Sequence, residues 1–315
     1  MRIQLPFALL AIVLACSLAS APAHARARVF VASYGNDSNP CTFGSPCKTF
    51  QQAVDVVDAG GEVTAIDSAG FGPINITKSV SITSPTGVEA GIVPAAGGNA
   101  ITIAAGAENE INLRGLIIEG SFTGATGIVF SSGGTLTIQD TVVRDFINSG
   151  IGLTPNSSAH FAVSNTSVIN NGGHGIFFQP SGGQPVFATF NRVEAYHNGL
   201  KGIGIFANVI GPTTPLIAAI TDCIAAYNTD GFYFMGPGAR ASVFQEVSIN
   251  RSTTMANITA GINAEDYAYI AVSETNLVEY IGGNWLADST SAICSYGNNY
   301  TDYAVTPCST IIPTK

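Results

Sequence analysis

The sequence predicts an all-β protein that coils into a solenoid, and three observations lead to this prediction. A glycine followed by an apolar residue recurs at steps of 23, 25, 27, 29 and 30 residues, at Gly127, Gly150, Gly175, Gly202, Gly231 and Gly261. Apolar and polar residues alternate with period two around these glycines, which is typical of strands. Aligned on the glycines, seven successive segments place like residues in the same columns.

Three columns of this alignment are mostly apolar, and a fourth is mostly polar. The apolar columns contain Leu113, Ile138, Val163, Phe190, Ile220, Phe244 and Val272; Leu116, Thr141, Thr166, Val193, Cys223, Val247 and Thr275; and Ile118, Val143, Val168, Ala195, Ala225, Ile249 and Leu277. The polar column, at a corner, contains Gly115, Asp140, Asn165, Arg192, Asp222, Glu246 and Glu274. One repeat cannot bury its apolar face alone, so each turn is expected to stack on the next, about 4.8 Å away.

This pattern resembles the right-handed parallel β-helix of the pectate-lyase-like superfamily, over about residues 29–300. The crossover rule for parallel strands predicts the right hand, and we expect about nine or ten coils. A β-sandwich of regular hairpins is the alternative, but it would not keep three columns aligned. Proteins of this superfamily mostly act on or bind polysaccharides, so the resemblance implies an extracellular polysaccharide partner, although a fold alone does not assign a function.

Residues 1–25 are predicted to be a signal peptide. Arg2 provides the charged start, residues 7–14 the apolar centre, and residues 23–25 an A-x-A cleavage site. The apolar run is too short to span a membrane, and no second run of that length follows. A lipoprotein anchored through Cys16 is the alternative. The prediction is a secreted protein, periplasmic or extracellular.

The cysteines suggest two bridges that fix the ends of the solenoid. In an oxidising compartment, Cys41 is expected to pair with Cys47 and Cys294 with Cys308. Cys223 falls in an inward column, which predicts a small core residue rather than a reactive thiol.

A short helix is predicted to cap the N-terminal end of the solenoid. Thr49 suits the N-cap, Gly60 and Gly61 end the segment, and four apolar residues at positions 50, 53, 54 and 57 share one face. The expected division is therefore an N-terminal strand, cysteine loop and capping helix at 26–60, a β-helix at 61–293 and a capping tail at 294–315.

The charge balance excludes one class of partner. The chain has 12 Lys and Arg against 21 Asp and Glu, a formal net charge of −9. No basic stripe is present to neutralise phosphates, so a nucleic-acid partner is not expected.

The candidate site lies on the strand that each repeat glycine opens. His174, Lys201 and Asp230 directly precede that glycine in three successive coils, and stacking would place them in one line, about 4.8 Å apart. The predicted substrate-binding residues on the same face are Phe177, Tyr233, Gln179, Phe206 and Asn263, with Phe177 and Tyr233 flanking a bare Gly204. Aromatic rings stack on the apolar faces of sugars while polar groups bind their hydroxyls.

These residues are compatible with either catalysis or binding. A lyase would use Lys201 as the base, assisted by His174, with Asp230 beside them. The alternative is a solvated turn with a weak surface ion pair. The G-H-G at 173–175 and N-T-D-G at 228–231 resemble polygalacturonase motifs, but their order is inverted and the adjacent aspartate pair and R-x-K are missing. No complete catalytic set is found.

The polar column also suggests a possible calcium site. Asp222, Glu246 and Glu274 occupy it in succession, and stacked carboxylates can bind Ca²⁺. Polar residues at a tight bend are the other explanation. Three functions therefore stay open: a glycan-binding or surface protein, a polysaccharide lyase, and a structural, adhesin-like solenoid.

Overall fold

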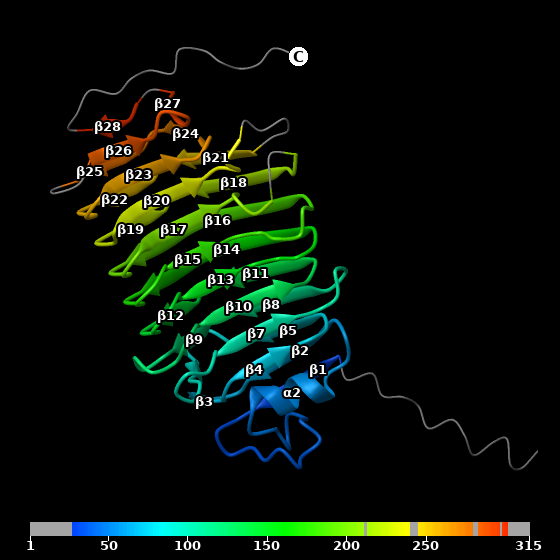
Figure 1. Cartoon of the computed structure of the whole chain (residues 1–315). Coiled ribbons are helices and arrows are strands. Elements are labelled where there is room, and N and C mark those ends of the chain that lie inside the picture. Colours follow the sequence, from blue (N-terminus) through cyan, green and yellow to red (C-terminus); the bar gives the residue numbers. More distant parts are fainter. Residues whose placement is uncertain (1–26, 211–212, 240–244, 280–282, 297, 302–315) are drawn as a thin grey trace, which may run out of the picture.

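The computed structural model describes residues 27–210, 213–239, 245–279, 283–296 and 298–301. It is an all-β parallel solenoid whose strands stack level above level, from β1 at one end to β28 at the other (Figure 1). The predicted signal peptide, Cys16, Phe244 and Cys308 lie outside the described residues. No helix in the described ranges is long and apolar enough to cross a membrane.

A nine-stranded parallel sheet forms one face, with one strand from each successive turn. Its strands are β4 (Ile74–Ile76), β7 (Ile101–Ala104), β10 (Ile128–Ser132), β13 (Ile151–Leu153), β15 (Ile176–Phe178), β17 (Lys201–Phe206), β20 (Asp230–Met235), β23 (Ala260–Glu265) and β26 (Gly283–Ala287).

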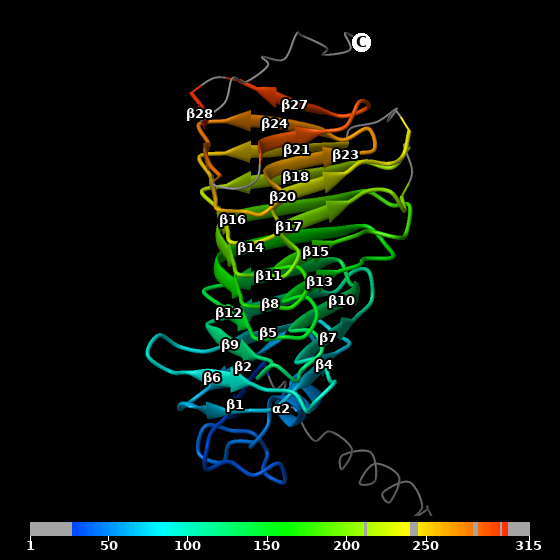
Figure 2. The same cartoon turned by 60° about the vertical axis from the view of Figure 1, so that its left-hand side comes forward.

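A 19-stranded parallel sheet bends around the rest of the solenoid (Figure 2). Its first row contains β1 (Arg28–Val31), β2 (Gly61–Ala65), β5 (Val80–Thr83), β8 (Glu110–Arg114), β11 (Thr135–Gln139), β14 (Ala159–Ile169), β16 (Val186–Tyr196), β18 (Leu216–Thr221), β21 (Gln245–Asn250), β24 (Tyr269–Ser273) and β27 (Ala292–Ser295). Its second row contains β3 (Ala69–Gly70), β6 (Ala90–Ile92), β9 (Leu116–Glu119), β12 (Val142–Arg144), β19 (Ile224–Ala226), β22 (Thr253–Met255), β25 (Asn276–Val278) and β28 (Tyr300–Thr301). The long strands β14 and β16 run through both rows.

The predicted register is confirmed along most of the solenoid. The apolar residues after the repeat glycines pair in succession and are buried: Ile128, Ile151, Ile176, Ile203, Phe232 and Ile262. Val168 likewise pairs with Val143 on one side and Ala195 on the other. The apolar columns are therefore the interior of the solenoid.

The predicted register is wrong in one turn, by five residues. Ile249, rather than Phe244, lies between Ile220 and Val272, and Val247 pairs with Ala218 rather than Cys223. Ser252 takes the place beside Cys223, and Thr254 takes the place predicted for Ile249. Residues 249, 252 and 254, which occupy these columns, have the same spacing as residues 244, 247 and 249, which were predicted to occupy them. The predicted set is the more apolar, so a criterion of apolar alternation selected the wrong set.

The N-terminal helix α2 (Phe50–Val56) packs against β1, β2 and β4 at the blue end of the solenoid (Figure 1). Thr49 is its N-cap, with a side-chain oxygen that accepts a hydrogen bond from the Gln52 amide at 3.2 Å. Phe50, Ala53 and Val54 are buried, as the apolar pattern predicted.

The cysteines agree with the predictions where the structure describes both partners. Cys41 is bonded to Cys47, whereas Cys308, the predicted partner of Cys294, lies outside the described residues. Cys223 is a free, buried thiol, and burial raises its pKa to about 11.

A buried ladder of side-chain amides runs along the turn that precedes the nine-stranded sheet. Each member is hydrogen-bonded to the next: Asn171, Asn198, Asn228, Asn257 and finally Glu279. The oxygen of each of the last four also accepts a bond from the backbone amide of the preceding member. Because a buried amide group without a partner is costly, the ladder fixes the backbone at the entrance to strands β15, β17, β20 and β23.

Candidate functional site

The strongest concentration of chemically active side chains lies on the outer face of the C-terminal half of the nine-stranded sheet. It is named here the outer-face cluster. Its members are His174, Phe177, Lys201, Phe206, Asp230, Tyr233, Asn263 and Glu265. The strands β15, β17, β20 and β23 position these residues, with His174 directly before the glycine that precedes β15. The ladder asparagines stand three residues before His174 and Lys201 and two residues before Asp230, so the same buried amides hold all three in line.

The predicted line of three ionisable residues is confirmed as a structural feature. Lys201 and Asp230 are register partners on β17 and β20, and the Lys201 ammonium forms an ion pair with the Asp230 carboxylate. One level earlier, the amide of Gly150 donates to the carbonyl of His174, and the amide of Gly175 to that of Lys201. The three residues therefore occupy one position in three successive turns.

The ion pair is not the weak surface pair that the sequence suggested. The Asp230 side chain is 0% exposed and that of Lys201 only 20% exposed. Asp230 lies between Lys201 on one neighbouring strand and Asn263 on the other, whose amide nitrogen is 3.4 Å from its second carboxylate oxygen. A carboxylate removed from water in this way depends on its cation, since an unpaired buried charge is strongly destabilising.

Four rings form a continuous aromatic strip across the cluster. The ring centroids of His174 and Phe177 are 5.1 Å apart, those of Phe177 and Phe206 4.9 Å, and those of Phe206 and Tyr233 5.2 Å. Phe206 fills the space that the sequence left open over Gly204, where a Cβ atom would lie 2.9 Å from the Phe206 ring. The absence of a side chain at Gly204 therefore accommodates the ring of Phe206 and does not leave an open space between the rings of Phe177 and Tyr233.

Tyr233 is held from both sides. The Lys201 ammonium lies 4.5 Å from the centroid of its ring, and its hydroxyl donates a 2.7 Å hydrogen bond to Glu265. Burial raises the pKa of Tyr233, and the negative charge of Glu265 raises it further. The amide nitrogen of Asn263 also contacts Glu265, at 3.2 Å. Tyr233, Asn263 and Asp230 are only 5%, 2% and 0% exposed, which leaves five partly accessible members: His174, Phe177, Phe206, Lys201 and Glu265.

His174 is a neutral imidazole above mildly acidic pH. Burial, followed by the positive charge of Lys201, lowers its pKa to about 4. Its Nδ1 atom is buried and has no hydrogen-bond partner. The predicted site residue Gln179 is not part of the cluster, because it follows β15 and its amide donates to Asn208.

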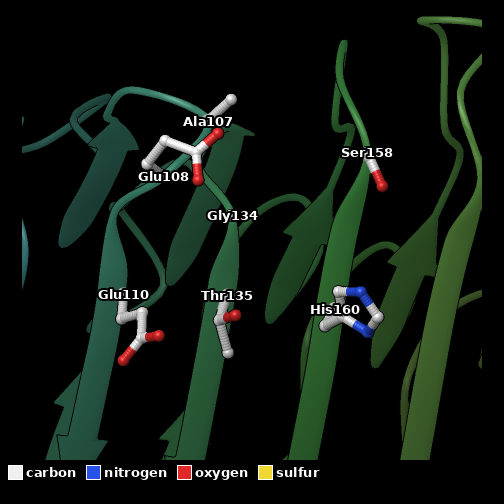
Figure 3. A pocket seen from close by; sticks show the side chains of 7 residues that line it. All are labelled: Ala107, Glu108, Glu110, Gly134, Thr135, Ser158 and His160. Carbon is white, nitrogen blue, oxygen red and sulfur yellow. The ribbon is translucent and has the colours of Figure 1, made fainter.

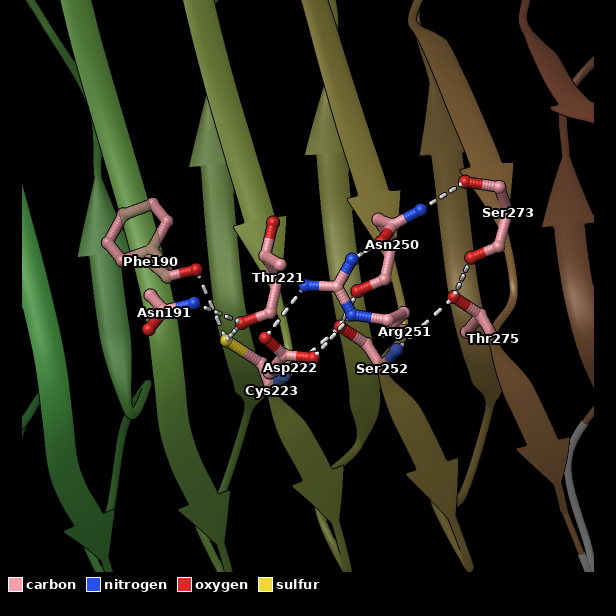
Figure 4. A network of polar contacts seen from close by, with 10 residues as sticks. All are labelled: Phe190, Asn191, Thr221, Asp222, Cys223, Asn250, Arg251, Ser252, Ser273 and Thr275. Atoms are coloured by element: carbon pink, nitrogen blue, oxygen red, sulfur yellow. Dashed lines mark hydrogen bonds and ion pairs between the residues drawn. The ribbon is translucent and has the colours of Figure 1, made fainter.

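The corner that suggested calcium has a different composition. Residues with a left-handed backbone conformation occupy every level of this corner from Gly115 to Glu274. Arg251 takes the place predicted for Glu246, which lies in β21 and pairs with Ile217 of β18. Arg251 donates two hydrogen bonds of 2.9 Å to Asp222 (Figure 4). The three carboxylates therefore do not stack, because a cation stands between two of them. No group of three or more metal-ligating side chains is found in the described part of the chain.

Two shallow depressions lie on other faces. One, of about 320 Å³, lies over the 19-stranded sheet, where Glu110, Thr135 and His160 project from neighbouring strands (Figure 3). The other, of about 350 Å³, lies along the ladder turn beside Phe122, Ile147 and His197. The sequence patterns did not single out either of them as a site.

Sequence reasoning missed the amide ladder, although the sequence contains a signal for it. Asn171, Asn198, Asn228 and Asn257 follow one another at steps of 27, 30 and 29 residues. These steps agree with those of the repeat glycines to within one residue, which indicates one position on successive turns.

Three solved structures are similar in fold. They are the pectate lyase Pel9A (TM-score 0.63, 15% identity, covering 89% of this chain and 81% of that one), an alginate lyase from Paenibacillus sp. str. FPU-7 (0.50, 13%, 87% and 99%) and a rhamnogalacturonan lyase (0.46, 14%, 88% and 88%). The sequence matches no protein-family model and no curated protein. At these identities the likeness concerns the fold alone. The chain thus has the pectate-lyase-like parallel β-helix fold that its repeats predicted.

Proposed function

We propose that the protein is a secreted glycan-binding protein that holds an extracellular polysaccharide against the outer-face cluster. The observation that carries this proposal is the aromatic strip from His174 to Tyr233, bordered by Lys201 and Glu265. Partly exposed rings bind the apolar faces of sugars, and neighbouring polar groups bind their hydroxyls. The other turns place Thr126, Ser149 and Ala260 at the position of the ionisable line, so stacking itself does not require charged residues there.

Binding is favoured over catalysis by the state of Lys201. A base must accept a proton through a free lone pair, but the side-chain nitrogen of Lys201 is held in an ion pair with the buried carboxylate of Asp230. Asp230 is fully buried and cannot reach a polymer on the surface. Neither residue is therefore well placed to move a proton to or from a substrate.

A polysaccharide lyase is the second candidate, since two of the structures with this fold are a pectate lyase and an alginate lyase. In β-elimination a base removes the C5 proton of a uronate, the C4–O bond breaks, a C4–C5 double bond forms, and the leaving oxygen gains a proton. Lys201 would be the base, with His174 beside it. This role requires Lys201 to lose its proton and separate from Asp230 when substrate binds.

Secretion is supported by the Cys41–Cys47 disulfide, because such bonds persist in oxidising compartments. The predicted signal peptide at residues 1–25 suggests the same destination. Partial proteolysis and mass mapping of the protein recovered from outside the cytoplasm would test both the cleavage after residue 25 and the bridge.

The binding proposal is tested by a glycan array, followed by titration of each glycan that scores. Phe177→Ala should weaken binding about tenfold, or about 1.4 kcal/mol. Phe187→Ala is a matched control, because Phe187 is also half-buried and its ring lies 5.0 Å from that of His160, on the 19-stranded sheet. Equal losses in both variants, or no binding to any glycan, would contradict the proposal.

The lyase candidate is tested on the same samples by the ultraviolet absorbance of unsaturated uronates. Turnover that Lys201→Met abolishes while binding persists would favour the lyase over the binding protein. Absence of new absorbance with every glycan that binds would leave binding as the function.

A further inference from the structure

The outer face of the nine-stranded sheet has an unusual charge balance. In the described residues its strands carry one cation, Lys201, and two carboxylates, Asp230 and Glu265. Lys201 is already paired with Asp230. Glu265 is hydrogen-bonded to the neutral groups of Tyr233 and Asn263, so its negative charge has no cationic partner among these contacts.

Further negative charge lies at the ends of the last two strands. Asp266 follows β23 directly, and its charge, with those of Glu265 and Asp230, adds to the burial that raises the pKa of Tyr233. Asp288 follows β26. Hydrogen bonds from the Asp266 amide and from Thr290 hold the pKa of Asp288 well below its usual value, which keeps it ionised. Both residues are exposed beside the cluster.

His174 does not offset this charge, because its lowered pKa leaves it neutral at ordinary pH. The other cations in the described residues that lack a carboxylate partner are elsewhere. Lys48 and Lys78 bind backbone carbonyls at the N-terminal end, and Arg192 binds Asn165 at the corner of the 19-stranded sheet. The net charge of −9 adds a repulsive field around the whole molecule.

We propose that the outer-face cluster selects uncharged polysaccharides, built from neutral hexoses, pentoses or N-acetylhexosamines, and rejects polyuronates. This inference rests on the proposed glycan-binding function and names the substrate class of that site. A polyuronate carries a carboxylate on each sugar and needs cations to neutralise it, whereas this face offers one cation that is already occupied. The aromatic strip and the hydrogen-bonding groups bind a neutral sugar without that requirement.

The test uses the purified protein and hexasaccharides of equal length. Cellohexaose, xylohexaose, mannohexaose and hexa-N-acetylchitohexaose are the neutral probes, and hexagalacturonate and hexamannuronate the acidic ones. At 20 mM NaCl, at least one neutral probe should bind at least tenfold more tightly than both acidic probes. A smaller difference, or the opposite order, overturns the inference while leaving glycan binding intact. Binding to none of the six overturns the proposed function and this inference with it.

Two further measurements test whether electrostatic repulsion causes the weaker binding of the acidic probes. Raising NaCl from 20 to 200 mM should strengthen any residual binding of hexagalacturonate, because salt screens like charges, and should leave the neutral probe unchanged. Asp266→Asn, at a left-handed position that asparagine tolerates, should strengthen hexagalacturonate binding about two- to threefold. If salt weakens hexagalacturonate binding instead, attraction operates and the inference is wrong.

Discussion

The two halves of the nine-stranded sheet share an interior but differ on their outer face. In the N-terminal half, β4 to β13, the outward residues are Asn75, Thr102, Val129 and Gly152. In the C-terminal half the same column continues with Phe177, Gly204, Tyr233 and Asn263. Because small, uncharged side chains suffice in one half, stacking does not require the rings and charges of the other. The outer-face cluster is an addition to the architecture.

The turn that precedes the sheet differs in the same way. The amide ladder extends from Asn171 to Glu279, all within the C-terminal half. One level before it, the equivalent position holds the buried ring of Phe146, whose backbone amide donates to Asn171. An apolar side chain therefore fills this turn where no cluster follows, while hydrogen-bonded amides fill it where the cluster is held.

The largest effect is expected from a charge in the interior, which both halves share. Val168→Asp and Ile118→Asp, in one buried column, would each bury a carboxylate among aliphatic neighbours, at a cost of several kcal/mol. Both variants should unfold or fail to accumulate. Asn112→Asp, on the exposed face of β8, is the control and should melt like the wild type. A folded Val168→Asp protein with wild-type melting would refute the register.

A smaller loss is expected where the halves differ. Lys201→Met removes the partner of a fully buried carboxylate and should cost about 3 kcal/mol. Thr126→Met, at the same repeat position in the N-terminal half, should cost less than 1 kcal/mol because no buried charge depends on it. Adding Asp230→Asn to Lys201→Met should restore part of the loss. Urea unfolding of the four proteins measures this, and equal losses in the two Met variants would mean that Asp230 does not need its cation.

The ladder should contribute somewhat less. Asn198→Ala leaves the backbone and side-chain amides of Asn171, and the carbonyl of Val168, without their partner, at a cost of about 2 kcal/mol. Asn112→Ala, on the surface of β8, should cost less than about 0.5 kcal/mol. Native-state hydrogen exchange should show the Asn171 amide opening faster in Asn198→Ala. Unchanged exchange there would mean that another group takes over the bond.

The sequence predicts the interior better than the outer face, for a physical reason. Inward positions repeat every turn, so the glycine columns gave the register of β10 to β23. The same criterion failed near β21, where Phe244, Val247 and Ile249 imitate the apolar spacing that belongs to Ile249, Ser252 and Thr254. Apolarity alone does not distinguish two alternations with the same spacing.

On the outer face, position in a column does not reveal burial. Lys201 and Asp230 were correctly aligned, yet the burial of Asp230 depends on its neighbours on both adjacent strands. The packing of the Phe206 ring over Gly204 likewise depends on the orientation of a side chain two residues further along the same strand. Such side-chain arrangements need the three-dimensional packing, which the repeat pattern does not contain.

The smallest expected effect concerns the neutral ring of His174. Its pKa is lowered from 6.5 to about 4 in the folded protein, so between these values the unfolded chain binds more protons than the folded one. Stability therefore rises with pH through this window and is lost as the pH falls from 6.5 towards 4. The stability that this pKa shift contributes, about 1.4 kcal/mol per pKa unit in full, is reduced here because the ring is partly exposed, which leaves about 1.5 kcal/mol.

Many carboxylates also titrate below pH 5, so the measurement must compare the pH dependence of stability in the wild type with that in a His174 variant. Urea unfolding at pH 4.5, 5.5, 6.5 and 7.5 should show a steeper slope for the wild type than for His174→Gln, while His197→Gln, at an exposed ring on the ladder turn, should keep the wild-type slope. Parallel slopes for the wild type and His174→Gln would show that the ring is charged in the folded protein. The two halves of the sheet would then not differ in their response to acid, although the N-terminal half has no counterpart of this histidine.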